Sequence, residues 1–251
     1  MKAIILAAGY ATRLYPLTRN KAKALLPIGG KPMIDYIVEQ MDTVAELDEI
    51  YVVTNSRFAA QFREWAAQAR SRLPISILDD GTTSDENRRG AIGDISFVIN
   101  EKQIDDELMV VAGDNFFTYS LRDYVAYFHE KDCDCVCVKE WPDEKTLSQF
   151  GIALLSTDGR VLDIEEKPEH PKSNMAVFAA YLYRQDTVPL FAEYLAAGNK
   201  PDAPGNFPAW LYRRKEVYAY VFEGECYDIG TPESYEEVQR LMAEGKLFPQ
   251  K

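Results

Sequence analysis

The chain opens with the stretch Lys2-Ala3-Ile4-Ile5-Leu6-Ala7-Ala8-Gly9-Tyr10-Ala11-Thr12-Arg13-Leu14, in which an apolar run gives way to small residues. The apolar run from Lys2 to Ala7 predicts a buried β-strand. Small residues after a strand permit a turn whose backbone N–H groups face a phosphate, although they are also typical of an ordinary turn. The stretch contains neither the GxGxxG pattern nor the GxxxxGK[ST] pattern, so neither a dinucleotide fingerprint nor a P-loop is predicted.

Strand-like and helix-like segments alternate along the rest of the chain. Strands are expected near 49–54, 75–78 and 108–112, and helices near 33–44, 58–72 and 92–100. Further on we expect a helix from Leu121, strands at 151–155, 161–164, 176–183 and 217–222, and helices at 188–197 and 232–244. Such alternation predicts βαβ units. The fold class is therefore α/β, with a Rossmann-like, mixed, mostly parallel sheet flanked by helices in a single domain.

Composition and charge narrow the classes of partner. The 251 residues are 47% hydrophobic and 27% charged, which is typical of a globular protein, and the formal charge of -12 argues against a nucleic-acid partner. No Asp or Glu precedes Asp35, while six Lys and Arg residues do, so a small anionic ligand is favoured over chance clustering of cations. The first apolar run is far shorter than the roughly 20 residues of a membrane span. We expect a cytoplasmic protein without a membrane partner.

Three cysteines alternate in a predicted strand. Cys133, Cys135 and Cys137 would share one face of that strand without converging. His129 and His170 have no ligand-like spacing with them. Reduced thiols are therefore expected rather than a metal site.

Two carboxylates stand at positions where a bound cation is plausible. Asp114 follows the strand at 108–112, and the carboxyl edge of a parallel sheet is where ligands bind, although an Asp there is also a common turn residue. Asp228 precedes Gly230-Thr231-Pro232, a helix start that Thr231 and Pro232 explain without it.

Several segments together resemble the sugar-1-phosphate nucleotidylyltransferase family. Residues 6–18 are similar to its opening signature L-A-G-G-x-G-T-R-L-x-P-L-T, and residues 22–27 and 31–34 to P-K-x-L-L-P and K-P-M-I. Gly113-Asp114-Asn115 and the Glu-Glu-Lys-Pro of 165–168 look most like the glucose-1-phosphate thymidylyltransferases and uridylyltransferases. The resemblance runs from Lys2 to about Val238. It implies the nucleotide-diphospho-sugar transferase fold, with a nucleotide-binding half at about 1–115 and a sugar-phosphate-binding half at about 116–251. The sequence has no hexapeptide-type repeats, so the C-terminal β-helix that some relatives carry is not expected.

The resemblance also implies roles for individual residues. The activity would be Mg2+-dependent transfer of a nucleoside monophosphate from a nucleoside triphosphate to a sugar 1-phosphate, with release of pyrophosphate. The implied catalytic residues are Arg13, Lys23 and Asp114, and the implied Mg2+ ligands are Asp114 and Asp228. Nucleotide binding is implied for Ala8, Gly9, Ala11, Thr12, Arg13, Asn87 and Gly90, and sugar-phosphate binding for Gly151, Glu166, Lys167 and Val177.

Two departures from the family signature leave alternatives open. Ala11 stands where the family has glycine, and Ala22 where it has proline, so the loop is expected to hold a triphosphate differently. The loop 79–90 lacks the family's glutamine, and Asn87, Thr83 or Asp85 would have to read the base, with dTTP or UTP favoured. Other interpretations are a cytidylyltransferase or guanylyltransferase acting on another phosphorylated metabolite, and a non-catalytic regulatory homologue. A homo-oligomer stays open.

Overall fold

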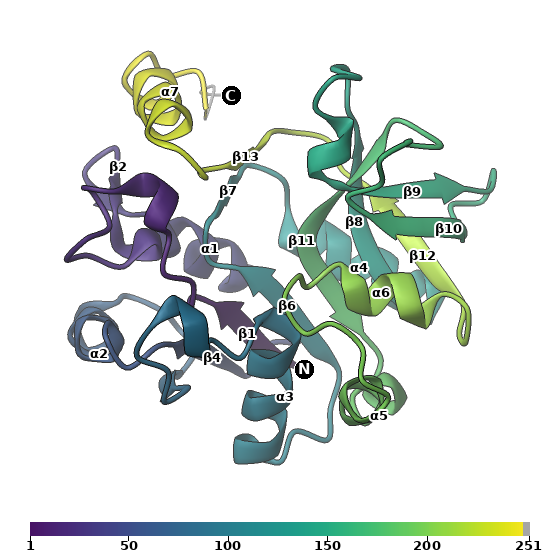
Figure 1. The fold of residues 1–251 in the computed structure, drawn as a ribbon, viewed down its shortest axis with the longest axis horizontal. Helices are drawn as coiled ribbons and strands as arrows, with labels where there is room; N and C mark the ends of the chain where they lie inside the picture. The colour runs from purple at the N-terminus through teal and green to yellow at the C-terminus, as the bar shows by residue number, and fades with distance from the viewer. Residues whose placement is uncertain (248–251) are drawn as a thin grey trace. The chain divides into compact units, whose positions relative to one another are not determined.

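A computed structural model describes residues 1–247, and its largest sheet is mixed (Figure 1). The sheet follows the order β10-β9-β11-β6-β1-β4-β5, while β8 pairs with both β11 and β12. The strands are β1 (Lys2–Leu6), β4 (Glu49–Thr54), β5 (Ile75–Asp79), β6 (Leu108–Ala112), β8 (Asp134–Glu140), β9 (Gly151–Leu155), β10 (Val161–Glu166), β11 (Met175–Tyr183) and β12 (Val217–Val221). Strand β4 pairs with β5, and β12 with β8, in parallel orientation. Strand β9 pairs antiparallel with both β10 and β11.

The chain forms two compact units that are interleaved in sequence. One unit contains residues 1–2, 89–110 and 123–223, and the other contains residues 3–88 and 111–122 with the chain from Gly224 onward. We call them the hairpin unit and the loop unit, after the β9–β10 hairpin and the loop that follows β1. The functional division near residue 115 stays a prediction.

In the loop unit, amphipathic helices cover apolar strands. Helix α1 (Met33–Met41) buries Met33, Ile34, Ile37, Val38 and Met41, the face that its periodicity predicts. Helix α2 (Ala59–Gln68) packs on β5, and residues 50–54 of β4 are buried.

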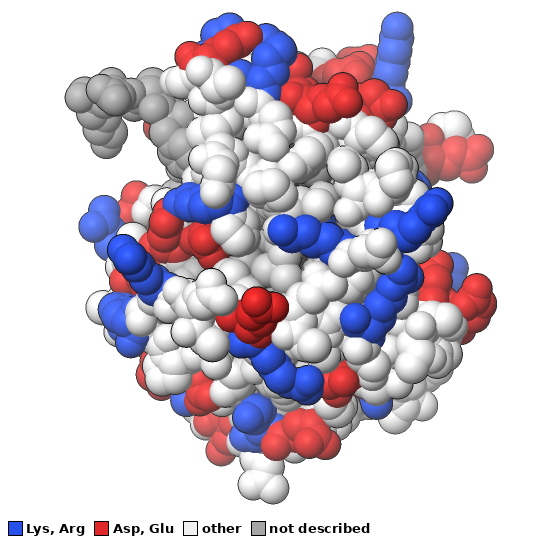
Figure 2. Space-filling view, turned by 90° about the vertical axis from the view of Figure 1, so that its left-hand side faces the viewer, with Lys and Arg blue, Asp and Glu red and all other residues white. Residues whose placement is uncertain are grey.

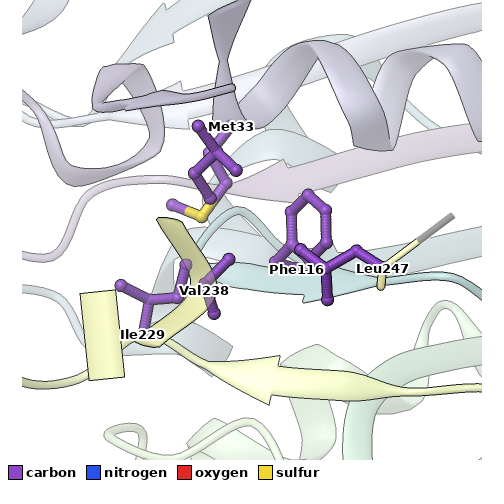
Figure 3. Close-up of a cluster of buried hydrophobic side chains, with 6 residues drawn as sticks. Met33, Phe116, Ile229, Val238 and Leu247 are labelled. Atoms are coloured by element: carbon purple, nitrogen blue, oxygen red, sulfur yellow. The ribbon is translucent and has the colours of Figure 1, made fainter. Parts of the chain in front are cut away.

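A small two-stranded sheet in the loop unit was not predicted. Strands β7 (Asn115–Phe117) and β13 (Cys226–Asp228) pair antiparallel, with Asp228 opposite Asn115. Helix α7 (Pro232–Ala243) follows, and its N-cap Thr231 accepts a hydrogen bond from the Ser234 N–H. Figure 3 shows Phe116 of β7 with Ile229 and Val238 from the β13–α7 segment in one apolar cluster. This cluster fixes Asp228 beside the strand that follows Asp114.

The hairpin unit carries an aromatic core beneath helices α5 (Leu190–Ala196) and α6 (Asn206–Leu211). The Phe191 and Phe207 rings stack with centroids 3.8 Å apart, and Tyr183 of β11 meets both edge-on. Helix α6 also packs on β10. The remaining helices are α3 (Ala91–Lys102) in this unit and α4 (Leu121–Lys131), whose first two residues belong to the loop unit.

The predicted elements are present, with differences at their ends. Between the first strand and the helix that begins at Met33 lie the short paired strands β2 (Pro27–Ile28) and β3 (Lys31–Pro32), which were not predicted, and neither was α6. Strand β8 begins at Asp134, so the interpretation that places Cys133 within the strand is wrong by one residue. The four cysteines are free, and no helix within residues 1–247 has the length and apolar character of a membrane span.

Candidate active site

Buried polar side chains hold the loop that follows β1 in one conformation. Asn55, which has no exposed surface, donates from Nδ2 to the Ala8 carbonyl oxygen at 2.8 Å. Thr18, also without exposed surface, donates from Oγ1 to the Ala11 carbonyl oxygen at 2.7 Å. The Asn55 amide and the Thr18 hydroxyl therefore form their hydrogen bonds with loop carbonyls rather than with water. The loop shape is therefore imposed by its surroundings as well as by its small residues.

The two departures from the family signature have structural explanations. Ala11 adopts φ 47° and ψ 45°, the left-handed conformation that glycine tolerates and alanine disfavours. Ala22 has φ -61°, the value of a proline, and its N–H donates to Gln61 Oε1 at 3.3 Å, a bond that proline could not make. Hydrogen bonds from Thr18 to the Ala11 carbonyl and from the Ala22 N–H to Gln61 hold these two positions.

A cavity of about 340 Å³ opens beside this loop, and all of its lining belongs to the loop unit. Six of the predicted residues line it: Gly9, Ala11, Thr12, Arg13, Lys23 and Asp114. Gly113, Gly230, Tyr10, Asp85 and Arg88 also line it. Figure 2 shows acidic and basic side chains interspersed with uncharged surface on the face that it draws, rather than one continuous charged face.

Lys23 lies between the two predicted metal ligands. Its Nζ is 2.8 Å from Asp114 Oδ2 and 3.7 Å from Asp228 Oδ1. Burial raises the pKa of Asp114, but the charge and hydrogen bond of Lys23 outweigh burial and, with Arg13, hold that pKa below its ordinary value. A Cβ at Gly230 would lie 3.5 Å from Arg13 Nη2 and 3.6 Å from Asp228 Oδ2. A Cβ there would make only ordinary contacts, so these distances show that Arg13 and Asp228 lie on either side of Gly230, while Lys23 lies between Asp228 and Asp114.

Of the side chains predicted in the loop 79–90, Asp85 lines the cavity and Asn87 does not. Asn87 Oδ1 accepts from the N–H groups of Thr83 and Ser84 at 3.2 and 3.0 Å, so its amide stabilises the loop itself. Asp85 and Arg88 line the cavity and form an ion pair at 2.9 Å. Sequence reasoning named Asp85 as an alternative and missed Arg88.

Tyr10 links the two loops and was also missed. Its hydroxyl donates to Thr82 Oγ1 at 3.2 Å, and Thr82 Oγ1 donates to Asp80 Oδ1 at 2.7 Å. All three residues are buried. Tyr10 could have been noticed in the sequence because it is a large aromatic residue within a run of small ones. A buried tyrosine hydroxyl needs a hydrogen-bond partner.

Gly90 belongs to the hairpin unit and has a packing role there. Its φ is 78°, and a Cβ would lie 2.6 Å from the Pro201 carbonyl oxygen. The N–H groups of Ala91 and Ile92 donate to the carbonyls of Asp202 and Pro201 at 3.1 and 2.9 Å. These carbonyls satisfy the first N–H groups of α3. A nucleotide-binding role for Gly90 stays a prediction.

The residues predicted to bind the sugar phosphate meet in the hairpin unit. Strand pairing sets Gly151 opposite Glu166 on one side and Val177 on the other, and Lys167 follows Glu166 with φ 51°. Ideal Cβ atoms at Gly151 and Gly205 would lie 2.9 and 2.0 Å from Glu166 Oε2. Two glycines therefore make the space for this carboxylate, and Gly205 was not predicted.

Burial raises the pKa of the Glu166 carboxyl, and the charge of Lys167 opposes that rise only in part. Among residues 1–247, no hydrogen bond to this carboxylate is formed. A half-buried carboxylate without protein donors is an acceptor available to a ligand hydroxyl.

The profile of the family described as "Nucleotidyl transferase" matches residues 2–245, nearly the whole chain. The chain belongs to the nucleotidyl transferase family. This confirms the predicted membership among the sugar-1-phosphate nucleotidylyltransferases.

Individual relatives of this nucleotidyl transferase differ in the base that their names state. A glucose-1-phosphate thymidylyltransferase from Neisseria meningitidis is 36% identical over 82% of this chain and 67% of its own length. A glucose-1-phosphate adenylyltransferase from Thermomicrobium roseum is 29% identical over 96% of this chain and 59% of its own. The chain spans 52% to 61% of the length of the first three curated relatives.

A solved structure confirms the predicted fold. The crystal structure of a UDP-glucose pyrophosphorylase complexed with UDP-glucose has a TM-score of 0.82 and covers 97% of this chain and 98% of that one, at 23% identity. At this identity the likeness concerns the fold alone.

The donor atoms of this nucleotidyl transferase suit Mg2+. Asp114 and Asp228 present the hard carboxylate oxygens that Mg2+ prefers, and a cationic group, the Lys23 ammonium, already lies within 4 Å of both. Within residues 1–247 no cluster of three or more His, Cys, Asp or Glu side chains could hold a metal. Water and phosphate oxygens would therefore complete the coordination.

Proposed function

We propose that the protein transfers a nucleoside monophosphate from a nucleoside triphosphate to a sugar 1-phosphate, with Mg2+ held by Asp114 and Asp228. The observation that carries this proposal is the convergence of Lys23, Arg13 and both carboxylates beside the loop after β1. In the reaction, an oxygen of the sugar phosphate forms a bond to the α-phosphorus. The bond from that phosphorus to the bridging oxygen of the β-phosphate breaks, and pyrophosphate leaves with the electron pair.

The two substrates are polyanions, so charge has to be neutralised before they meet. Each pair of unit charges at 4 Å repels by about 4 kcal/mol at an effective dielectric of 20. Bound Mg2+ supplies positive charge at the phosphates. Arg13 and Lys23 line the same cavity and offset charge on the leaving pyrophosphate. No covalent nucleophile is needed, because phosphoryl-type transfer depends on positioning and electrostatic stabilisation.

The sugar phosphate is assigned to the group around Glu166. Its carboxylate accepts hydrogen bonds from sugar hydroxyls, and Lys167 pairs with the phosphate. The missing side chain at Gly151 leaves room beside Val177, whose Cβ lies 3.4 Å from the ideal Cβ position of Gly151. This assignment is supported by the absence of protein donors to Glu166 within residues 1–247.

For the base, dTTP or UTP is favoured, and glucose 1-phosphate is the favoured acceptor. Support comes from the Gly113-Asp114-Asn115 and Glu-Glu-Lys-Pro segments. Asp85 and Arg88 replace Asn87 as the side chains of loop 79–90 that face the cavity. An Arg N–H and a carboxylate oxygen side by side complement a carbonyl next to an imino N–H, a pattern that thymine, uracil and guanine present and that cytosine and adenine lack.

The test is pyrophosphate release with Mg2+ and glucose 1-phosphate, using dTTP, UTP, CTP, GTP and ATP separately. Turnover with dTTP or UTP that Asp114→Asn abolishes is the expected result. Glu39→Gln is the matched control, because it removes a carboxylate of the same unit that pairs with Lys31 and does not line the cavity. Turnover with a purine triphosphate or CTP alone would refute the base assignment. Nucleotide-sugar binding without turnover across a panel of acceptors would refute catalysis.

A further inference from the structure

The Lys23 side chain is unusually buried for a lysine. Its side chain retains 11% of its exposed surface, while Asp114 and Asp228 retain 44% and 58%. Lysine ammonium groups normally remain hydrated at the end of an exposed stem. Lys23 begins a 3₁₀ turn over Lys23–Leu25 in which Ala24 and Leu25 are buried, so the backbone beneath its stem is fixed. The ammonium therefore has a defined place between the two carboxylates.

The local charges balance in this arrangement. Asp114 and Asp228 contribute two negative charges, and Lys23 and Arg13 contribute two positive ones. A divalent cation on the same carboxylates would bring the cluster to a net +2. The Lys23 ammonium already hydrogen-bonds Asp114 Oδ2 at 2.8 Å, so the cation and the ammonium compete for one oxygen. Both cannot occupy that position, because like charges at about 4 Å repel strongly.

We propose that the Lys23 ammonium holds the place of the divalent cation in the metal-free protein and is released toward bound phosphate when the cation enters. This inference rests on the proposed function, since it takes Asp114 and Asp228 as the metal ligands. It gives Lys23 two successive partners. The lysine keeps the carboxylates together without metal, and with metal it becomes an unpaired cation in a cavity for a polyphosphate.

Lysine suits this exchange better than its neighbour Arg13 does. Its ammonium is a compact point charge on a flexible four-carbon stem, whereas a guanidinium is planar and prefers fixed bidentate partners. Within residues 1–247, Arg13 forms no ion pair shorter than 4 Å, although its charge acts on Asp114. Arg13 therefore provides a control of equal charge that does not occupy an Asp114 oxygen.

The experiment is a titration with Mn2+ alone, without nucleotide or sugar, read by the loss of the free Mn2+ electron paramagnetic resonance signal. We expect Lys23→Met to bind Mn2+ about tenfold or more tightly than the unaltered protein, because a competing unit charge has been removed. Lys23→Arg, which retains the charge, should bind as weakly as the unaltered protein. Arg13→Met should gain only a few-fold through the general change in charge.

Circular dichroism and thermal unfolding establish that each variant is folded, and Lys23→Gln replaces Lys23→Met if that protein does not fold. Equal Mn2+ affinity in the unaltered protein and Lys23→Met would overturn the inference. An equal gain in Lys23→Met and Arg13→Met would also overturn it, since charge alone would then be responsible. Absence of Mn2+ binding by every variant would overturn it as well, because Asp114 and Asp228 would then hold no cation even without the Lys23 ammonium. The titration uses no substrate, so its failure is distinguishable from a failure of pyrophosphate release.

Discussion

Replacing Gly205 by alanine should weaken binding of the sugar phosphate without destabilising the protein. The new Cβ would lie 2.0 Å from Glu166 Oε2, and ordinary van der Waals contact begins at 3.4 Å, so this oxygen must retreat by about 1.4 Å. The carboxylate ends a flexible side chain, and the neighbouring Tyr181 hydroxyl is 3.6 Å from the same Cβ position. Glu166 is therefore expected to move while the backbone stays in place.

The displacement converts to a change in affinity through the hydrogen bonds that Glu166 is proposed to accept. A hydrogen bond to a charged group contributes about 1.5–3 kcal/mol, which corresponds to roughly 10- to 150-fold in KM for the sugar phosphate. Stability should not fall, because Gly205 has φ -67° and ψ -15°, a conformation that alanine adopts freely. A compatible Gly→Ala change stabilises a protein by about 0.4–1 kcal/mol.

The assay is the initial rate against sugar 1-phosphate at saturating nucleotide, with thermal unfolding measured in parallel. KM for the nucleotide should not change, since neither Gly205 nor Glu166 lines the cavity beside the loop after β1. Repeating Gly205→Ala in a Glu166→Ala background closes a double-mutant cycle. An unchanged KM for sugar phosphate, or an equal loss in both backgrounds, would refute the role of Glu166.

Three further predictions concern stability. Ala11→Gly should raise the free energy of unfolding, measured by urea denaturation, by up to about 1 kcal/mol. Relief of a left-handed alanine is worth about 1–2 kcal/mol and exceeds the entropy that glycine adds to the unfolded chain; a lower free energy of unfolding contradicts this. Tyr10→Phe should lose about 0.5–1.5 kcal/mol with its buried hydrogen bond to Thr82, and an unchanged midpoint would show that the bond contributes nothing. Burial raises the pKa of Glu166 above its ordinary 4.5, so the folded state binds that proton more tightly than the unfolded chain does. Stability associated with this group is present below pH 4.5 and is lost as the pH rises through the folded pKa. Glu166→Gln should therefore raise the Tm at neutral pH, with a gap that closes in acid; a gap independent of pH would contradict the assignment.

Local patterns predicted the main elements because each depends on neighbouring residues. The β-branched run Glu49–Thr54 and the apolar run Leu108–Ala112 are strands with the predicted bounds. The pairing of β7 with β13 depends on residues more than 100 positions apart, so periodicity could not reveal it. Helix α6 has only six residues, too few for an amphipathic pattern to stand out.

Side-chain geometry was less predictable than backbone geometry. The sheet edge suggested Asp114 as a ligand-site residue, family resemblance added Lys23 and Asp228, and the structure brings these three side chains together. Asn87 was predicted as a base contact, yet its amide satisfies backbone N–H groups inside its own loop, a local choice that spacing does not disclose. Gly205 lies next to Glu166 in the candidate sugar site although the two residues are far apart along the chain, so local sequence patterns could not reveal this contact.

Two carboxylates in the hairpin unit, the buried Asp134 and the half-buried Glu166, differ in their hydrogen-bond partners. Asp134 has no exposed surface, and burial raises its pKa, yet it accepts from the Arg184 N–H and Thr187 Oγ1 at 2.8 Å each and pairs with Lys215 at 3.3 Å. Those partners make Asp134 a structural link between strands and the segment that follows β11. Glu166 is also buried enough for its pKa to rise, but within residues 1–247 it receives no hydrogen bond. Unmet acceptor capacity, rather than burial itself, is therefore the observation that supports the proposed ligand-binding role of Glu166.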